Sequence, residues 1–270
     1  MKKVSWLLIF SFLLIVSLAG CSGGNTTQPS QNAAQVKPTE ITVSAAASMQ
    51  NSLKELQKAY AQKKPGVKIN FNFGASGTLQ QQIEQGASVD LFISAGKTQM
   101  DALEQKNLIV KDSRINLLSN VLVLITGKDN STVTSLQDLT KASVGKISIG
   151  TPKSVPAGNY AQESLTSLKL WDALQSQSKL VYAQDVSQVL NYVETGNADA
   201  GIVYQSDAHG STKAKVVEVI PASSHKAIVY PAAVIATTKN KQDTDDFLKY
   251  LESAEAQKVF ASYGFETITK

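Results

Sequence analysis

The sequence predicts an α/β fold built as two lobes. Strand-like and helix-like segments alternate from residue 40 to residue 106, an order typical of a largely parallel sheet flanked by helices. The alternation restarts at residue 121 with a continuous apolar strand. About 230 residues follow the start of the first strand, which suits one large unit or two lobes. We expect each lobe to hold a mixed, mostly parallel sheet, with a ligand cleft between the lobes.

The first run of elements contains three strands and three helices. The strands are expected at residues 40–46, 68–73 and 89–94, and the helices at 49–63, 78–85 and 98–106. In the first helix, apolar residues recur at helical spacing on one face. These residues are Met49, Leu53, Leu56 and Tyr60. This face is expected to pack on the sheet.

The second run is expected to contain six strands and three helices. The strands are placed at residues 121–125, 146–150, 179–183, 200–203, 216–220 and 227–235, and the helices at 135–139, 157–168 and 186–195. Two closing helices, at 243–251 and 254–263, are not assigned to a lobe by their pattern. Crossovers near residues 119–123 and 225–232 are the hinge candidates. We expect residues 40–119 and 232–270 to form lobe 1, and residues 120–231 to form lobe 2.

Residues 1–20 predict a signal peptide. Lys2 and Lys3 precede an apolar run over residues 4–18, which is too short for a typical transmembrane helix. The run ends in the letters LAGC, which resemble the lipobox of bacterial lipoproteins, so Cys21 is the expected lipidation site. The alternative is an ordinary signal peptide with an incidental cysteine. Residues 21–39 are polar and nearly uncharged, which predicts a flexible tether. The chain is expected outside the cytoplasm, anchored to a membrane.

The composition excludes several classes of site. Cys21 is the only cysteine, so neither an intramolecular disulfide nor a cysteine-only metal site is possible. Removal of the signal peptide lowers the formal net charge from +4 to +2, which gives no reason to expect a nucleic-acid partner. The two histidines, His209 and His225, lack metal-ligand spacing.

No motif in the chain predicts catalysis. Residues 96–98 (GKT) resemble the end of a phosphate-binding loop, but Leu91 stands where that motif needs glycine. Thr78 stands where a nucleophile elbow needs its last glycine. Three aspartates show no spacing of a catalytic pair or metal site: Asp90, Asp101 and Asp185. We expect neither an enzyme nor a cofactor. The rival hypotheses of an anchored enzyme and of an adhesion module have no support in the motifs.

Four strand-to-helix junctions are candidates for ligand binding, because ligands of α/β sheets bind where strands end and helices begin. They contain Ser48, Ser76, residues 155–158 and residues 184–187. A helix start leaves unpaired backbone N–H groups and the positive end of the helix dipole, which together favour anions. The alternative interpretation is that Ser48 and Ser76 only cap their own helices.

At these junctions the sequence resembles the molybdate-binding proteins of bacterial ABC transporters. The motifs lie at residues 43–48 (VSAAAS), 73–79 (FGASGTL), 90–95 (DLFISA), 155–161 (VPAGNYA), 185–186 (DV) and 201–207 (GIVYQSD). The resemblance implies the type II periplasmic-binding fold, in which the ion lies between the two lobes. It also implies a membrane permease as partner and a monomeric receptor.

The resemblance implies five residues that bind the ion. The oxyanion would accept hydrogen bonds from the hydroxyls of Ser48, Ser76 and Tyr204, and from the backbone N–H groups of Ala157 and Val186. Without the resemblance, Tyr204 would be interpreted as a packed residue after a buried strand. Molybdenum would be held as an oxyanion, with no side chain coordinating the metal.

The expected donors suit molybdate or tungstate. Molybdate is a dianion at neutral pH that can only accept hydrogen bonds, whereas phosphate usually keeps one proton and needs an acceptor. No carboxylate occurs among the five residues, although Asp185 is adjacent to one of them. The alternative is a receptor of the same fold for sulfate or another small anion, which a charged residue in the site would indicate.

Overall fold

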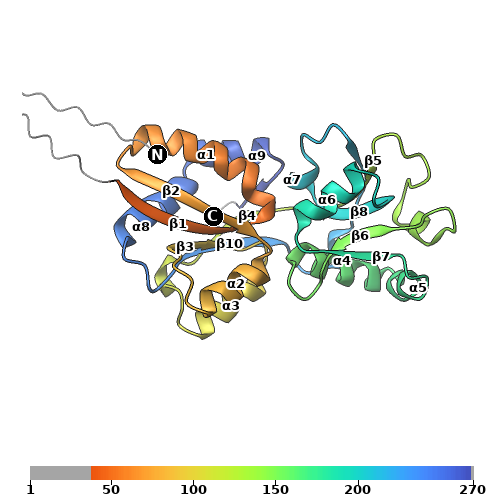
Figure 1. Cartoon of the computed structure of the whole chain (residues 1–270), viewed down its shortest axis with the longest axis horizontal. Coiled ribbons are helices and arrows are strands. Elements are labelled where there is room, and N and C mark those ends of the chain that lie inside the picture. The colour runs from red at the N-terminus through yellow and green to blue at the C-terminus, as the bar shows by residue number, and fades with distance from the viewer. Residues whose placement is uncertain (1–37, 269–270) are drawn as a thin grey trace, which may run out of the picture. The chain divides into compact units, whose positions relative to one another are not determined.

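The computed structural model describes residues 38–268 and shows two mixed sheets flanked by helices (Figure 1). The predicted signal peptide, Cys21 and residues 21–37 of the predicted tether lie outside the described residues. The predicted α/β class and two-lobed architecture are confirmed. The exact lobe boundaries stay a prediction.

The first sheet has six strands in the order β11-β4-β10-β3-β1-β2. The strands are β1 (Thr39–Ala46), β2 (Val67–Gly74), β3 (Leu91–Ile93), β4 (Ile115–Ser119), β10 (Val229–Val234) and β11 (Glu266–Thr267). β1 runs parallel to both β2 and β3, whereas β10 runs antiparallel to β3 and β4. The sheet is parallel where the chain crosses over through helices and antiparallel where the later segment returns.

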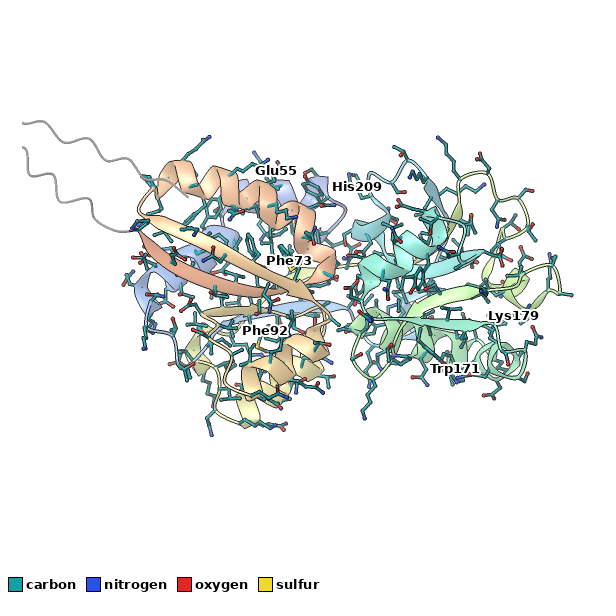
Figure 2. All side chains as sticks on the ribbon, in the orientation of Figure 1. Glu55, Phe73, Phe92, Trp171, Lys179 and His209 are labelled. Atoms are coloured by element: carbon teal, nitrogen blue, oxygen red, sulfur yellow. The ribbon has the colours of Figure 1, made fainter. Side chains whose placement is uncertain are left out.

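Helices cover this first sheet. They are α1 (Gln50–Lys63), α2 (Ser76–Glu84), α3 (Lys97–Gln105), α8 (Lys241–Leu251) and α9 (Ala254–Ser262), with 3-10 turns η1 (Ala47–Met49) and η2 (Lys111–Ser113). α8 contacts β10 and β1, and α9 contacts α1 and β11. The two closing helices therefore belong with the first sheet. Phe92 of β3, labelled in Figure 2, is fully buried in the apolar cluster that α2 and α3 share with this sheet.

The second sheet has five strands in the order β7-β6-β8-β5-β9. The strands are β5 (Leu122–Gly127), β6 (Ile147–Gly150), β7 (Leu180–Ala183), β8 (Ala200–Tyr204) and β9 (Ala214–Val219). The helices are α4 (Pro156–Ser167), α5 (Trp171–Ser176), α6 (Val186–Glu194) and α7 (Gln205–Ala208), with 3-10 turns η3 (Leu136–Thr140) and η4 (Ala222–Ser224). β6 runs parallel to β7 and β8, and β5 runs antiparallel to β8 and β9.

Close packing of α4 on β6 sets the position of one helix start. A Cβ atom on Gly158 would lie 1.9 Å from the carbonyl oxygen of Gly150, so only glycine allows this approach. Pro156 begins α4, where its fixed φ suits the first turn and its missing N–H is not needed. The N-terminus of α4 is therefore held against the end of β6, at the edge where ligands of such sheets bind.

Four elements were not expected from the sequence: β4, β11, α5 and α7. The segment at residues 135–139, predicted as a short helix, is the 3-10 turn η3. β11 has two exposed residues and α7 has four residues, so neither is long enough to show a periodic pattern. β4 and β5 stand only two residues apart, and Asn116 and Ser119 interrupt the apolar pattern of β4. The structure separates them because the chain leaves the first sheet at Asn120 and enters the second.

Candidate oxyanion-binding site

A small cavity brings the five predicted residues together. Ser48, Ser76, Ala157, Val186 and Tyr204 all line it. It encloses about 210 Å³ of space between the atoms. The space open to the centre of a water-sized sphere is about 10 Å³, close to the roughly 10–15 Å³ that one bound water needs. In this closed arrangement the cavity has room for nothing larger than a small ligand. That these residues bind the ion stays a prediction.

Ser76 presents a free hydroxyl proton. It is the first residue of α2, whose N-cap is Ala75, so Ser76 does not cap the helix. Its Oγ instead accepts a hydrogen bond from the backbone N–H of Ala95 at 3.0 Å. The side chain is 1% exposed, and within the described residues Oγ has no acceptor of its own. Its proton is left to donate to a ligand.

Ser48 does not cap a helix either. It lies inside the turn η1, whose N-cap Ala46 makes no side-chain capping bond. Its Oγ lies 3.0 Å from the hydroxyl oxygen of Tyr230. Both serines are therefore held by partners distant in the sequence. The interpretation that they only cap their helices is wrong.

Two further helix starts face the cavity from the second sheet. Ala157 is the second residue of α4, and Val186 is the first residue of α6. Their backbone N–H groups fall in the first turn, where no partner exists within the helix. The positive dipole ends of α2, α4 and α6 thus meet at one cavity.

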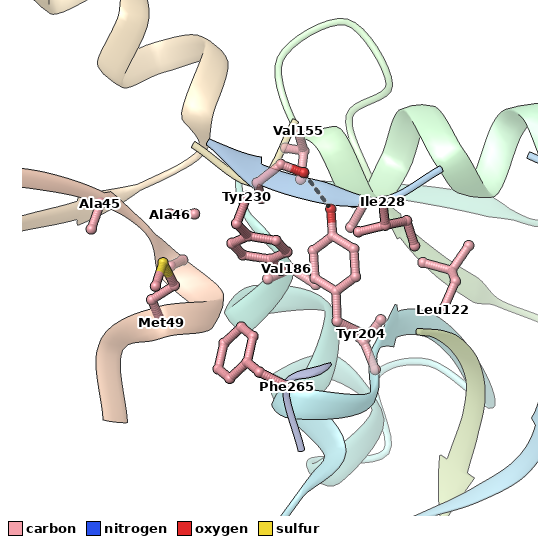
Figure 3. Close-up of a cluster of buried hydrophobic side chains, with 14 of the residues drawn as sticks. Ala45, Ala46, Met49, Leu122, Val155, Val186, Tyr204, Ile228, Tyr230 and Phe265 are labelled. Carbon is pink, nitrogen blue, oxygen red and sulfur yellow. Dashed lines mark hydrogen bonds between the residues drawn. The ribbon is translucent and has the colours of Figure 1, made fainter. Parts of the chain in front are cut away.

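Tyr204 supplies the third hydroxyl. It ends β8, is 1% exposed, and donates a long hydrogen bond of 3.4 Å to the carbonyl oxygen of Ala95. Figure 3 shows its ring beside those of Tyr230 and Phe265. Burial, and next the neighbouring Tyr230, raise the pKa of Tyr204 well above its ordinary value. The hydroxyl therefore keeps its proton. In this structure the proton is directed at the Ala95 carbonyl oxygen, so Tyr204 donates to a ligand only by turning away from that long hydrogen bond.

Two carboxylates near the cavity accept hydrogen bonds from backbone N–H groups. Asp185, which lines the cavity, is the N-cap of α6 and accepts from the N–H of Gln188 at 2.9 Å. Asp207 accepts from the N–H of Tyr204 at 3.1 Å. Burial, opposed by that hydrogen bond and assisted by the charge of Asp185, raises the pKa of Asp207 to about 8. No lysine or arginine of the described residues lines the cavity.

Sequence reasoning did not identify Ala95, Asn120 or Tyr230. Ala95 closes the third strand motif at residues 90–95, so its position at a strand end was a usable signal. Asn120 and Tyr230 form hydrogen bonds behind Ser48 and have no local pattern of their own.

Other hollows are larger but differ in kind. One, of about 1020 Å³ by the same measure, is lined by residues that include Lys54, Glu55 and His209. Figure 2 labels Glu55 and His209 there, and both are exposed. Such an open, solvated surface contrasts with the enclosed donors of the small cavity.

Residues 38–268 hold neither a metal-binding cluster nor a membrane-spanning helix. Their histidines and acidic side chains form no group of three or more that could hold a metal ion. None of the helices over the same range has the length and apolar character needed to cross a membrane.

Comparison with known proteins connects this site to a family. YvgL of Bacillus subtilis, whose name assigns it to the ABC transporter substrate-binding lipoproteins, is 44% identical over 256 residues, which cover 94% of each chain. The molybdate-binding protein ModA of Haemophilus influenzae is 43% identical over 84% of this chain and 89% of its own.

A solved structure and a family model agree with these relatives. The substrate-binding domain assigned to a molybdenum ABC transporter of Clostridium difficile superposes with a TM-score of 0.67 at 45% identity, covering 86% of this chain and all of that one. The resemblance expected from the sequence motifs is confirmed. The family model of bacterial extracellular solute-binding proteins matches residues 41–266. The chain therefore belongs to the bacterial extracellular solute-binding protein family.

Proposed function

We propose that this protein is an extracytoplasmic receptor that binds molybdate, and also tungstate, and delivers the ion to the permease of an ABC transporter. The observation that carries the proposal is the cavity in which three hydroxyls and three helix starts converge without a cationic side chain. The names of the similar proteins, which describe molybdate binding and ABC transport, support the same ligand and partner.

The donor set fits a fully deprotonated oxyanion. Each hydrogen bond to a charged partner contributes about 1.5–3 kcal/mol. The helix dipoles add roughly 0.3–1 kcal/mol each near their N-termini. Neutral donors also avoid burying a fixed cation, whose desolvation is expensive. A buried dianion can therefore be held by Ser48, Ser76, Tyr204 and the backbone of Ala157 and Val186.

Phosphate and sulfate are the competing anions. Hydrogen phosphate carries a proton that needs an acceptor, whereas the five residues of the proposed site act as donors. The carboxylate of Asp185 also lines the cavity, and its Oδ1 accepts the capping N–H of Gln188. Sulfate has the charge and acceptors of molybdate but is smaller, so it would leave some donors too far away. Size, rather than charge, is the expected basis of discrimination between these two dianions.

The proposed receptor also needs to open and close around the ion and to stay at the membrane. The chain passes between the sheets at residues 120–121 and returns at residues 220–228, and rotation about these two crossovers would open and close the cavity. Lipid on Cys21, outside the described residues, would keep the monomeric receptor at the membrane beside its permease. Binding and delivery, rather than catalysis, are the proposed activity.

Calorimetry on the purified full-length protein tests the ligand. We expect tight binding of molybdate and tungstate, weak binding of sulfate and no binding of phosphate. The double variant Ser48→Ala with Ser76→Ala should lower molybdate affinity by about 100-fold or more, because two charge-assisted hydrogen bonds are removed.

Ser52→Ala is the matched control, because Ser52 is also buried but donates to the carbonyl oxygen of Met49, just before its own helix, and does not line the cavity. It should bind as the wild type does. A folded wild-type protein that binds neither molybdate nor tungstate would contradict the proposed ligand.

A further inference from the structure

A chain of buried polar side chains lies behind Ser48 at the two crossovers between the sheets. Asn120 follows β4 and precedes β5, and Tyr230 lies in β10 just after the chain returns. The amide nitrogen of Asn120 lies 2.8 Å from Ser206 Oγ and 3.2 Å from the Tyr230 hydroxyl oxygen. The Tyr230 hydroxyl lies 3.0 Å from Ser48 Oγ. These hydrogen-bonded side chains connect α7, both crossovers and the cavity.

Asn120 fixes which atoms donate and which accept in this row of hydrogen bonds. Its Oδ1 accepts the backbone N–H of Val121 at 2.9 Å, so the amide nitrogen must face Ser206 and Tyr230. An amide nitrogen can only donate, and its two protons match these two neighbours. The Tyr230 hydroxyl is therefore an acceptor toward Asn120.

The direction of the Asn120–Tyr230 hydrogen bond affects the direction of the next one, between Tyr230 and Ser48. Its hydroxyl has one proton, and Ser48 Oγ is at hydrogen-bond distance to accept it. Tyr230 is 0% exposed, and burial is the main reason why its pKa lies well above the ordinary value, so it keeps the proton. The 3.0 Å contact allows either oxygen to donate, and the direction in which Ser48 accepts is the one that uses the Tyr230 proton.

The proton of Ser48 is then free for the cavity. Among residues 38–268, Ser48 Oγ has no hydrogen-bond partner other than Tyr230. Because one of its lone pairs is occupied, the remaining O–H turns toward the space that Ser48 lines. Without Tyr230 the hydroxyl would rotate freely, and its oxygen would accept a proton as readily as it donates one.

We propose that Tyr230 and Asn120 are positioning residues that hold Ser48 as a hydrogen-bond donor, so that the site selects unprotonated oxyanions against protonated ones such as hydrogen phosphate. The inference rests on the proposed function, because it concerns the same cavity. It adds two residues that touch no ligand, and it locates part of the selectivity at the crossovers rather than in the cavity wall.

Tyr230→Phe tests this role in the full-length protein by calorimetry. We expect molybdate affinity to fall about five- to tenfold, since one oriented hydrogen bond becomes disordered. Phosphate, which the wild type is expected not to bind, should become detectable as a competitor that displaces bound molybdate, because a freely rotating Ser48 hydroxyl can accept its proton. Tyr60→Phe is the matched control, because Tyr60 is buried in the first lobe and its hydroxyl has no partner among the described residues. It should leave both anions unaffected.

A double-mutant cycle with Ser48→Ala separates positioning from a general effect on the fold. If Tyr230 acts through Ser48, Tyr230→Phe should change molybdate affinity less than twofold when Ser48 is already alanine. An equal loss in both backgrounds would overturn the proposal, as would a Tyr230→Phe variant that loses molybdate affinity but still excludes phosphate completely. If the wild type binds sulfate instead of molybdate, the proposed ligand fails, and the same cycle run with sulfate still decides the role of Tyr230.

Asn120→Ala is a second probe should Tyr230→Phe lower the melting temperature of the ligand-free protein. Without the Asn120 amide, the Tyr230 hydroxyl stays beside Ser48 but can either donate to it or accept from it. We expect a smaller loss of molybdate affinity than with Tyr230→Phe, and no additional loss when Tyr230 is already phenylalanine. A further loss of molybdate affinity in that background would contradict the proposal that Asn120 acts on Ser48 through Tyr230.

Discussion

At the scale of single residues, the cavity depends on which atoms hold protons. The hydroxyls of Ser76 and Tyr204 are engaged by the backbone N–H and C=O of one residue, Ala95. Ser48 is engaged by Tyr230. Each serine oxygen is used as an acceptor by the protein, which leaves its proton for the ligand. An anion site without cations is built in this way from neutral groups.

Asp207 gives a pH-dependent prediction at this scale. The pKa of about 8 in the folded chain lies above the ordinary value of about 3.9, so between these values the folded state binds a proton that the unfolded state has released. The free energy of unfolding should therefore decline as the pH rises from about 4 to about 8. Asp207→Asn should remove this slope, because asparagine can still accept the N–H of Tyr204.

Urea unfolding of the ligand-free protein at pH 5 and pH 8 measures the effect. The stability of Asp207→Asn relative to the wild type should rise between the two pH values. A difference that is the same at both would show that Asp207 is ionised throughout this range.

At the scale of elements, the start of a helix is a binding group only if the helix is held in place. α4 is held by the contact of Gly158 with the Gly150 carbonyl of β6. α6 is held by its N-cap, Asp185. The first N–H groups of both helices are thereby aimed at the cavity, and their position depends on packing beneath them.

Gly158→Ala tests the contact between α4 and β6. The added Cβ would overlap the Gly150 carbonyl, so we expect a loss of about 1–3 kcal/mol in stability and weaker oxyanion binding as Ala157 is displaced. Urea denaturation and calorimetry measure the two effects.

Gly66→Ala is the control, because nothing lies within 4 Å of the position where its Cβ would stand. It should be neutral. If Gly158→Ala were also neutral, α4 would not be fixed by this approach.

At the scale of the whole folded unit, a direct contact joins the two lobes beside the cavity. The backbone N–H of Gly77, in the first turn of α2, donates to the carbonyl oxygen of Ser154 at 2.9 Å. A Cβ on Gly77 would lie 2.6 Å from that oxygen. The lobes can therefore meet here only because residue 77 has no side chain.

Gly77→Ala is expected to oppose closure without unfolding either lobe. Molybdate affinity should fall at least tenfold, while the melting temperature of the ligand-free protein stays near that of the wild type. Calorimetry and thermal unfolding measure these quantities, and small-angle scattering with saturating molybdate should show a larger radius of gyration for the variant. Unchanged affinity would mean that the contact does not limit closure.

The fold was predictable to the extent that its elements are long and periodic. Both runs of alternating strands and helices were anticipated, and the four missed strands and α-helices are all short. The junctions that hold Ser48, Ser76, Ala157 and Val186 were candidates from the pattern of strands and helix starts. The choice of these residues within the junctions came from the family motifs, and so did Tyr204, because a tyrosine after a buried strand is normally a packing residue.

The sequence by itself determined the two-lobed α/β class, the helix starts rich in small residues and the family motifs, because these are set by neighbours a few residues apart. Only the tertiary structure brought Ser48 beside Tyr230, a residue 182 positions away. A hydrogen bond between distant segments leaves no periodic pattern in the chain. The direction in which a hydroxyl donates depends on all of its partners, and only folding brings those partners together.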